Sequence, residues 1–334
     1  MKEKSPLLDK QVIIYLSILI IIAVLILISA RHILFKPWTA RHWAEPAVLG
    51  ETVYLFGGIN DRNATDPKDF LEKDILLLNL DESTLKRAGE LPSRRYSVSA
   101  AELNGSIYVA GGYDLKSYLD EILVYDPAAQ EIKLMGTMPE PRAFGALVEQ
   151  QGRLFYLGGW NGKEIASTVF EIDPATGSVT EFASPVPPLQ LFSSVSTGEK
   201  VYVIGGEGSD RKNSNVVYEI DLLKGKVLRK GELPAGVNRA AAAFMNGSIY
   251  VIASPMDAEV KEIYRIHCDE EELTVSIPGQ FRDRGYDLSL AGYNNHLYLM
   301  GGGEERFGRQ IRIRKIELAT LRTESVLLKS FVWW

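Results

Sequence analysis

The sequence has little of what metal binding, disulfide formation or nucleic-acid binding would require. It contains one cysteine, Cys268, so no intrachain disulfide can form. Its four histidines show no metal-ligand spacing. Lysine and arginine number 37 against 43 aspartates and glutamates, a formal net charge of −6, so the basic stripe typical of nucleic-acid binders is missing. We therefore expect no metal, no cofactor and no nucleic-acid partner.

Catalytic motifs are missing as well. Cys268 follows His267, but successive residues of a strand point to opposite faces, so the two would not meet as nucleophile and base. The run Gly301-Gly302-Gly303 has no helix after it, so it does not match a phosphate-binding loop. We predict no catalytic residues, and we expect Cys268 to be a buried structural thiol.

One long stretch of the chain lacks charge entirely. From Val12 to Ala30 there are 19 uncharged residues, eight of them isoleucine. As a helix they would span roughly 28 Å, close to the thickness of a bilayer's hydrocarbon core. The alternative is a cleaved signal peptide ending at Ser29-Ala30, but the apolar region of signal peptides is usually about 7 to 15 residues long. We predict an uncleaved, single-pass transmembrane helix.

This helix divides the chain into four predicted parts. They are a polar tail (1–11), the transmembrane helix as signal anchor (12–30), a connector (31–40) and a globular domain (41–334). Lysine and arginine within about 15 residues of the helix tie at three on each side, so the charge rule gives no orientation. We adopt the usual signal-anchor topology, with an extracytoplasmic globular domain in the periplasm, the extracellular space or a lumen.

The globular part contains a sixfold repeat and no helical periodicity. An apolar run ending in two glycines, as in Ile107-Tyr108-Val109-Ala110-Gly111-Gly112, occurs five times, and a sixth copy ends in Ala253-Ser254 instead. The first glycine, or the residue in its place, is at positions 57, 111, 158, 205, 253 and 301, which gives spacings of 54, 47, 47, 48 and 48. Such a period indicates an array of similar supersecondary units.

Each unit contains four short runs typical of strands. A turn such as Asn104-Gly105 precedes the glycine-ended run and predicts a hairpin, because both central residues of such a turn need positive φ. A third run ends in an acid, as in Val124-Tyr125-Asp126-Pro127, and a fourth, more polar run leads to a loop such as Met138-Pro139-Glu140-Pro141-Arg142. Six units of four strands predict a six-bladed β-propeller.

These residues resemble the kelch-repeat family of propellers over roughly residues 38–330. The shared marks are the glycine pairs, Tyr125-Asp126-Pro127 and Pro141-Arg142. Two features depart from the family: its usual fourth-strand tryptophan is missing from every repeat, and the fifth repeat has no glycine pair. The expected fold is therefore all-β, a six-bladed kelch-like propeller preceded by a single N-terminal transmembrane helix.

Two sets of loops are expected to surround one mouth of the central channel, where the resemblance implies that ligands or partner peptides bind. Arginine guanidinium groups beside aromatic rings can bind carboxylates, phosphates, sugar acids and acidic peptides. The alternative is that an arginine repeated in each blade pairs with an acid of the adjacent blade and fastens the ring. The predicted binding residues are Arg94, Arg95, Arg142, Arg239 and Arg284 before the first strands, and Asp61, Asp114, Trp160, Asn161, Glu207 and Glu304 after the glycine pairs.

The expected function is a membrane-anchored scaffold that binds proteins or ligands, as a subunit of a membrane-associated complex. The alternative is an enzyme that acts on a sugar acid, because six-bladed kelch-like proteins include sialic acid mutarotases. In that case Glu207, with Arg142 and Arg239, would be the candidate acid or base and the carboxylate-holding groups. A third alternative is a purely structural propeller that packs against other membrane subunits.

Overall fold

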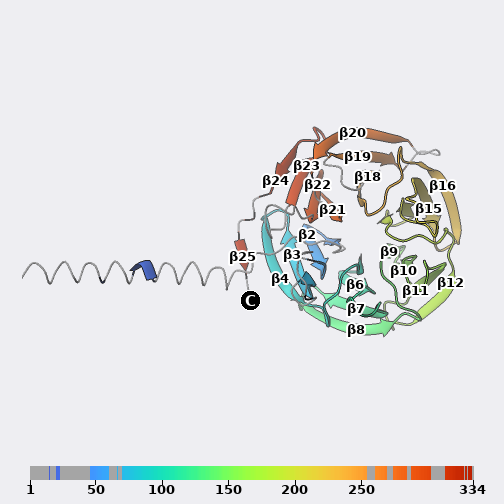
Figure 1. Ribbon diagram of the computed structural model, residues 1–334, viewed down its shortest axis with the longest axis horizontal. Helices are drawn as coiled ribbons and strands as arrows, with labels where there is room; N and C mark the ends of the chain where they lie inside the picture. The colour runs from blue at the N-terminus through green and yellow to red at the C-terminus, as the bar shows by residue number, and fades with distance from the viewer. Residues whose placement is uncertain are drawn as a thin grey trace, which may run out of the picture. The chain divides into compact units, whose positions relative to one another are not determined.

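The computed structural model of this protein contains a ring of six sheets, each built from four antiparallel strands paired in sequence order, and one of the sheets has a fifth strand (Figure 1). This confirms the all-β, six-bladed propeller. The ring belongs to a compact unit of residues 40–334, and residues 1–39 form a separate unit. The structure describes residues 15, 20–22, 46–59, 66, 70–253, 260–268, 274–283, 287–301, 313–326, 328 and 330–332.

Each of the first three blades is a continuous piece of chain in which the fourth strand forms the outer rim (Figure 1). Blade 1 consists of β1 (Pro46–Leu49), β2 (Thr52–Phe56), β3 (Asp74–Asn79) and β4 (Thr84–Glu90); blade 2 of β5 (Ser99–Leu103), β6 (Ser106–Ala110), β7 (Glu121–Asp126) and β8 (Glu131–Thr137); blade 3 of β9 (Ala146–Gln150), β10 (Arg153–Leu157), β11 (Thr168–Ile172) and β12 (Val179–Ala183).

The last three blades are continuous as well, and one short strand follows them. Blade 4 consists of β13 (Ser193–Ser196), β14 (Val201–Ile204), β15 (Val216–Asp221) and β16 (Lys226–Glu232); blade 5 of β17 (Ala241–Met245), β18 (Ser248–Ala253), β19 (Val260–His267) and β20 (Val275–Arg282); blade 6 of β21 (Leu288–Tyr293), β22 (His296–Gly301), β23 (Ile313–Glu317) and β24 (Thr323–Ser325), after which comes β25 (Ser330–Val332).

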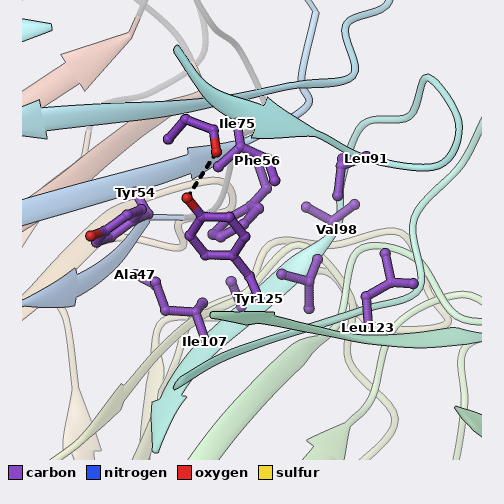
Figure 2. Close-up of a cluster of buried hydrophobic side chains, with 12 residues drawn as sticks. Ala47, Tyr54, Phe56, Ile75, Leu91, Val98, Ile107, Leu123 and Tyr125 are labelled. Carbon is purple, nitrogen blue, oxygen red and sulfur yellow. Dashed lines mark hydrogen bonds between the residues drawn. The ribbon is translucent and has the colours of Figure 1, made fainter. Parts of the chain in front are cut away.

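The apolar second strands are buried because blades cover both of their faces. In β6, every residue after Ser106 is buried, whereas the outer strand β8 shows no residue that is fully buried. A hydrophobic core joins each blade to the next along the chain from blade 1 to blade 6. Between blades 1 and 2, the Tyr125 ring lies 6.0 Å from that of Phe56, and its hydroxyl donates to the Ala88 carbonyl at 2.9 Å (Figure 2).

The glycine pairs allow the chain to pass closely from one blade to the next. Gly111 has a φ of 69°, and a Cβ atom there would stand 2.2 Å from the carbonyl oxygen of Arg142 in the linker to blade 3. Gly57, Gly158 and Gly205 meet the following linker in the same way, with Cβ approaches of 2.4 to 2.6 Å. Both the left-handed backbone and the contact exclude a side chain, which explains why the pair recurs in five of the six repeats.

The predicted transmembrane helix, Val12 to Ala30, lies almost entirely outside the described residues. Tyr15 and residues 20–22 are described; they are helical and exposed. Among the residues that the structure describes, no helix is long and apolar enough to cross a membrane. The polar tail and the connector also lie outside the described residues.

Candidate binding face

One face of the ring carries the linkers between blades and the loops between the second and third strands, and we call it the loop face. Backbone pairing holds these two sets of segments together in three blades. The isolated bridges join Tyr96 to Tyr113 in blade 2, Ala143 to Trp160 in blade 3, and Gln190 to Glu207 in blade 4. These segments are therefore a fixed platform for the side chains that they carry.

Arg95, which the sequence predicts to be on this face, is instead fully buried, with 0% of its surface exposed. Its carbonyl accepts a hydrogen bond of 2.9 Å from the Gly58 amide of blade 1. Its guanidinium enters blade 2, where it pairs with the carboxylate of Glu121 and donates to the Ser93 hydroxyl at 2.7 Å. Since the side chain is covered, Arg95 cannot line a ligand face, and this corrects the prediction.

Arg142 repeats this arrangement one blade further on and is also 0% exposed. Its carbonyl accepts from Gly112 of blade 2 at 2.8 Å, and its guanidinium pairs with Glu140 and lies 4.6 Å from the centroid of the Phe170 ring in blade 3. The corresponding positions in blades 4 and 5 are the buried apolar residues Leu189 and Val237. The position therefore needs a buried side chain that joins two blades. The prediction that Arg142 lines a binding face is corrected for the same reason, because its side chain is covered.

Three other predicted residues hold loops in shape. The side chains of Asp114 and Asn161 each accept hydrogen bonds from two backbone amides of their own loop, as residues of Asx turns do. The Asn161 side chain also donates to Glu140 at 2.9 Å, and Arg94 donates to the Leu71 carbonyl at 2.7 Å. Asp61, Arg284 and Glu304 lie outside the described residues.

A continuous group of half-buried aromatic side chains crosses the loop face from blade 2 to blade 3. Tyr113 stacks on Tyr118 at 4.4 Å between ring centroids, and Tyr96 meets Tyr113 edge-on at 5.7 Å. Tyr96 also meets Phe144 at 6.0 Å, and Tyr118 is hydrogen bonded to the Trp160 side chain. Burial raises the pKa of Tyr118, so its hydroxyl stays protonated. We call this group the aromatic row: Tyr96, Tyr113, Tyr118, Phe144 and Trp160.

A polar cluster continues the aromatic row into blade 4. The Arg211 guanidinium lies 6.0 Å from the Trp160 ring centroid and 3.2 Å from the Glu207 carboxylate. Glu207 also accepts a hydrogen bond of 3.0 Å from the Gln190 side chain. The structure thus brings Trp160 and Glu207, both predicted, next to Arg211, which the sequence did not single out.

A small cavity of about 120 Å³ lies on the ring axis, lined by residues that precede or begin the first strands. At one equivalent position in each of blades 2 to 6, the lining residue has a left-handed backbone, with φ between 53° and 61°. Non-glycine residues in this conformation cost about 1 to 3 kcal/mol each and occur preferentially at functional sites. The residues at this position are Ser97, Phe144, Leu191, Arg239 and Asp287.

Charge gathers on one side of this axial cavity. The Arg239 side chain is one-third exposed, and its Nη1 lies 3.7 Å from the carboxylate of Asp287, which is 2% exposed. Nearby, burial lowers the pKa of Lys261, while the negative charges of Asp283 and Asp287 act in the opposite direction. Arg239 was predicted from the sequence, whereas Asp287 was missed because it precedes its strand without any motif.

Comparisons with known proteins agree with the repeat and the fold. A family model described as the KLHDC2/KLHL20/DRC7 Kelch-repeats domain matches residues 42–253. The chain belongs to the kelch-repeat family. The kelch resemblance expected from the glycine pairs is thereby confirmed, although the matched region ends at the blade that has lost its pair.

Two further similarities place this kelch protein among known chains. An F-box/kelch-repeat protein of Arabidopsis thaliana is 33% identical over 74 residues, which is 22% of this chain and 17% of the relative. The solved structure titled "Structure of YjhT" superposes with a TM-score of 0.70 at 16% identity, over 86% of this chain and 98% of that one. At such low identity the second similarity shows a common fold and nothing more.

Proposed function

We propose that this kelch propeller is a scaffold that binds a partner protein on its loop face, through the aromatic row. The observation that carries the proposal is the row itself, in which five aromatic side chains are half-buried and held by one another. Tyrosine, tryptophan and arginine dominate the binding energy of protein interfaces. Because backbone bridges already order these loops, binding of a partner would cost little conformational entropy in the loops.

Substitution of the aromatic row tests this function. Full-length protein in mild detergent would be cross-linked and purified, and its stoichiometric partners would be identified by mass spectrometry. We expect Trp160→Ala to reduce partner recovery at least tenfold, since truncating an interface hot spot costs about 2 kcal/mol or more. Leu134→Ala is the matched control, because Leu134 is an exposed apolar residue (61%) on the outer strand β8. Equal recovery with both variants would contradict the proposal.

We also propose that the segment from Val12 to Ala30 anchors the propeller on the extracytoplasmic side of a membrane, within a membrane-associated complex. Its support is the length and apolar character of the segment. In alkaline carbonate extraction, the protein should stay with the membrane pellet. Ile21→Lys with Val24→Lys should release it, because lysine near a bilayer centre is strongly unfavourable. Release of the unmodified protein would contradict anchoring.

The axial cavity favours a second candidate function, binding or conversion of a small sugar acid. Its support is Arg239, which lines the cavity with a side chain that is one-third exposed and whose guanidinium matches a carboxylate in charge and geometry. Arg142 is buried away from the cavity, and Glu207 is not among the lining residues, so Asp287 is the acidic group beside a bound ligand. Calorimetry and NMR of anomer exchange with sugar acids would test this. We expect Arg239→Ala to abolish both sugar-acid binding and anomer exchange. A variant that binds sugar acids and exchanges their anomers as the unmodified protein does would exclude a role of Arg239 in holding the carboxylate.

A further inference from the structure

Blade 6 and blade 1 meet at a seam where, among the described residues, neither blade takes any of its four successive strands from the other end of the chain. All four strands of blade 1 come from residues 46–90, and all four of blade 6 come from residues 288–325. Closure therefore depends on contacts between separate blades, including the packing of β1 against β21. The Tyr293 hydroxyl also donates to the Asp81 carboxylate at 2.9 Å across this seam.

The C-terminal strand β25 crosses the same seam. It pairs in parallel with β4, the outer strand of blade 1, and aligns Ser330 with Thr84, Phe331 with Leu85 and Val332 with Lys86. Figure 1 shows β25 outside the ring beside β4. Since β24 of blade 6 ends at Ser325, four residues carry the chain from the rim of one blade to the rim of the next.

We propose that β25 is a releasable strap that closes the ring and covers the outer edge of β4. An uncovered outer strand exposes unpaired amides and carbonyls, to which a strand from another chain can add. A pairing of three residues contributes few hydrogen bonds, so β25 can detach while β3 still holds β4 through its full antiparallel ladder. Release would loosen the seam and uncover the outer edge of β4. This inference concerns the rim and seam, and it stands apart from the proposed function of the loop face.

Amide hydrogen exchange of the full-length protein in mild detergent tests the strap. Three variants are compared with the unmodified chain: a truncation after Val326, Phe331→Pro and Phe331→Ala. Proline removes an amide of β25 and restricts its backbone, whereas alanine keeps the amide and changes only the side chain. Outward-facing amides of β8 and β16 are internal references, because neither outer strand has a further strand paired to it among the described residues.

We expect the truncation and Phe331→Pro to raise exchange by tenfold or more at those amides of Thr84–Lys86 that point toward β25, to the level of the β8 and β16 references. The amides that point toward β3 should stay protected, and Phe331→Ala should be closer to the unmodified chain. Unchanged exchange in β6 and β10 would show that the propeller remains folded. The melting temperature should fall in the truncated protein because the seam is weaker. Exchange at Thr84–Lys86 that is the same with and without β25 would overturn the proposal, whether or not partner binding at the aromatic row is retained.

Discussion

At the residue scale, the buried arginines show how a charged side chain can serve packing. Arg95 and Arg142 have their backbone fixed on one blade and their guanidinium group inside the next, so each joins two blades. Leu189 accepts the same type of backbone hydrogen bond, from Gly159, without any charge. The contact between blades therefore requires a buried side chain at this position, whether charged or apolar. Where the side chain is an arginine, a nearby glutamate neutralises its charge.

Substitution of Arg142 by leucine should therefore be tolerated. The carboxylate that Arg142→Leu leaves behind, Glu140, is 37% exposed and keeps its hydrogen bond from Asn161, so no buried charge is left unpaired. We therefore expect Arg142→Leu to change the free energy of unfolding by about 1 kcal/mol or less. Arg142→Ala leaves a cavity and should cost about 2 to 5 kcal/mol. Urea unfolding of the full-length protein in detergent measures both. Equal, large losses in the two variants would mean that the charge itself is required.

A buried carboxylate predicts how stability depends on pH. Asp221 lies at the junction of blades 3 and 4, where Lys200 donates to it at 2.8 Å and Gln150 at 3.3 Å. The hydrogen bond from Lys200, followed by the contact with Lys224, lowers the pKa of Asp221 from 3.8 to about 2. Because the folded pKa is below the unfolded one, this stabilisation is complete above about pH 5 and is lost as the pH falls toward 2.

The pH prediction is checked with Asp221→Asn. The unmodified protein should lose more stability between pH 6 and pH 3 in urea unfolding than the variant, which has no carboxylate to protonate at this junction. Asp210→Asn is the control, because the Asp210 side chain is 61% exposed on a loop. A variant that lost as much stability on acidification as the unmodified protein would show that Asp221 does not contribute.

At the element scale, the second strand and its glycine pair determine how each blade meets the next. The apolar strand is buried on both faces, and the glycine that follows it lets the next linker approach within hydrogen-bonding distance. In blade 5 the strand β18 continues to Ala253, where the glycine would be. This explains how the fifth repeat remains a blade although the sequence mark is missing.

Substitution of one of these glycines should destabilise the ring. Gly111→Ala places a Cβ atom 2.2 Å from the Arg142 carbonyl oxygen and requires a left-handed alanine, so linker and strand must both shift. We expect a loss of about 2 to 4 kcal/mol in the free energy of unfolding. Gly105→Ala is the control: Gly105 also has positive φ, but no atom lies within 4 Å of its added Cβ. Equal losses of stability in the two variants would mean that the positive φ, and not the contact with the linker, makes the glycine necessary.

At the scale of the whole molecule, the stacking of adjacent blades brings together residues that are about one repeat apart in the chain. Arg239 and Asp287 are 48 residues apart in the chain and meet at the axial cavity, and the aromatic row collects side chains from the linkers and loops of two blades. Each blade buries its core only against its neighbours. The stacking of adjacent blades therefore both stabilises the ring and assembles the aromatic row.

Removal of one blade should consequently destroy the cooperativity of the ring. Truncation after Asp283 deletes blade 6 and leaves the apolar face of blade 5 without the partner that it packs against. We expect dye binding to exposed apolar surface and loss of the single unfolding transition, measured by fluorescence and circular dichroism. A truncated protein with one sharp transition and no dye binding would contradict this view.

From the sequence alone we could predict the number of blades, the order of their strands and the kelch family, because these follow from local constraints that recur. An Asn-Gly turn, a buried apolar run and a glycine that must be left-handed each depend on a few adjacent residues. Their spacing of about 47 residues then requires six similar units.

The roles of the arginines and aromatic residues become clear only in the folded ring. Arg95 and Arg239 both precede a first strand, yet one is buried between blades and the other borders the axial cavity. The two occupy different positions of the repeat, because Arg95 aligns with Val237 and Arg239 aligns with Ser97. The residues that surround each side chain come from other blades, so the position in the repeat does not by itself give the role of the arginine. The aromatic row, the pairing of Arg239 with Asp287 and the strap across the seam likewise depend on how the ring closes, which brings together segments that are distant in the chain.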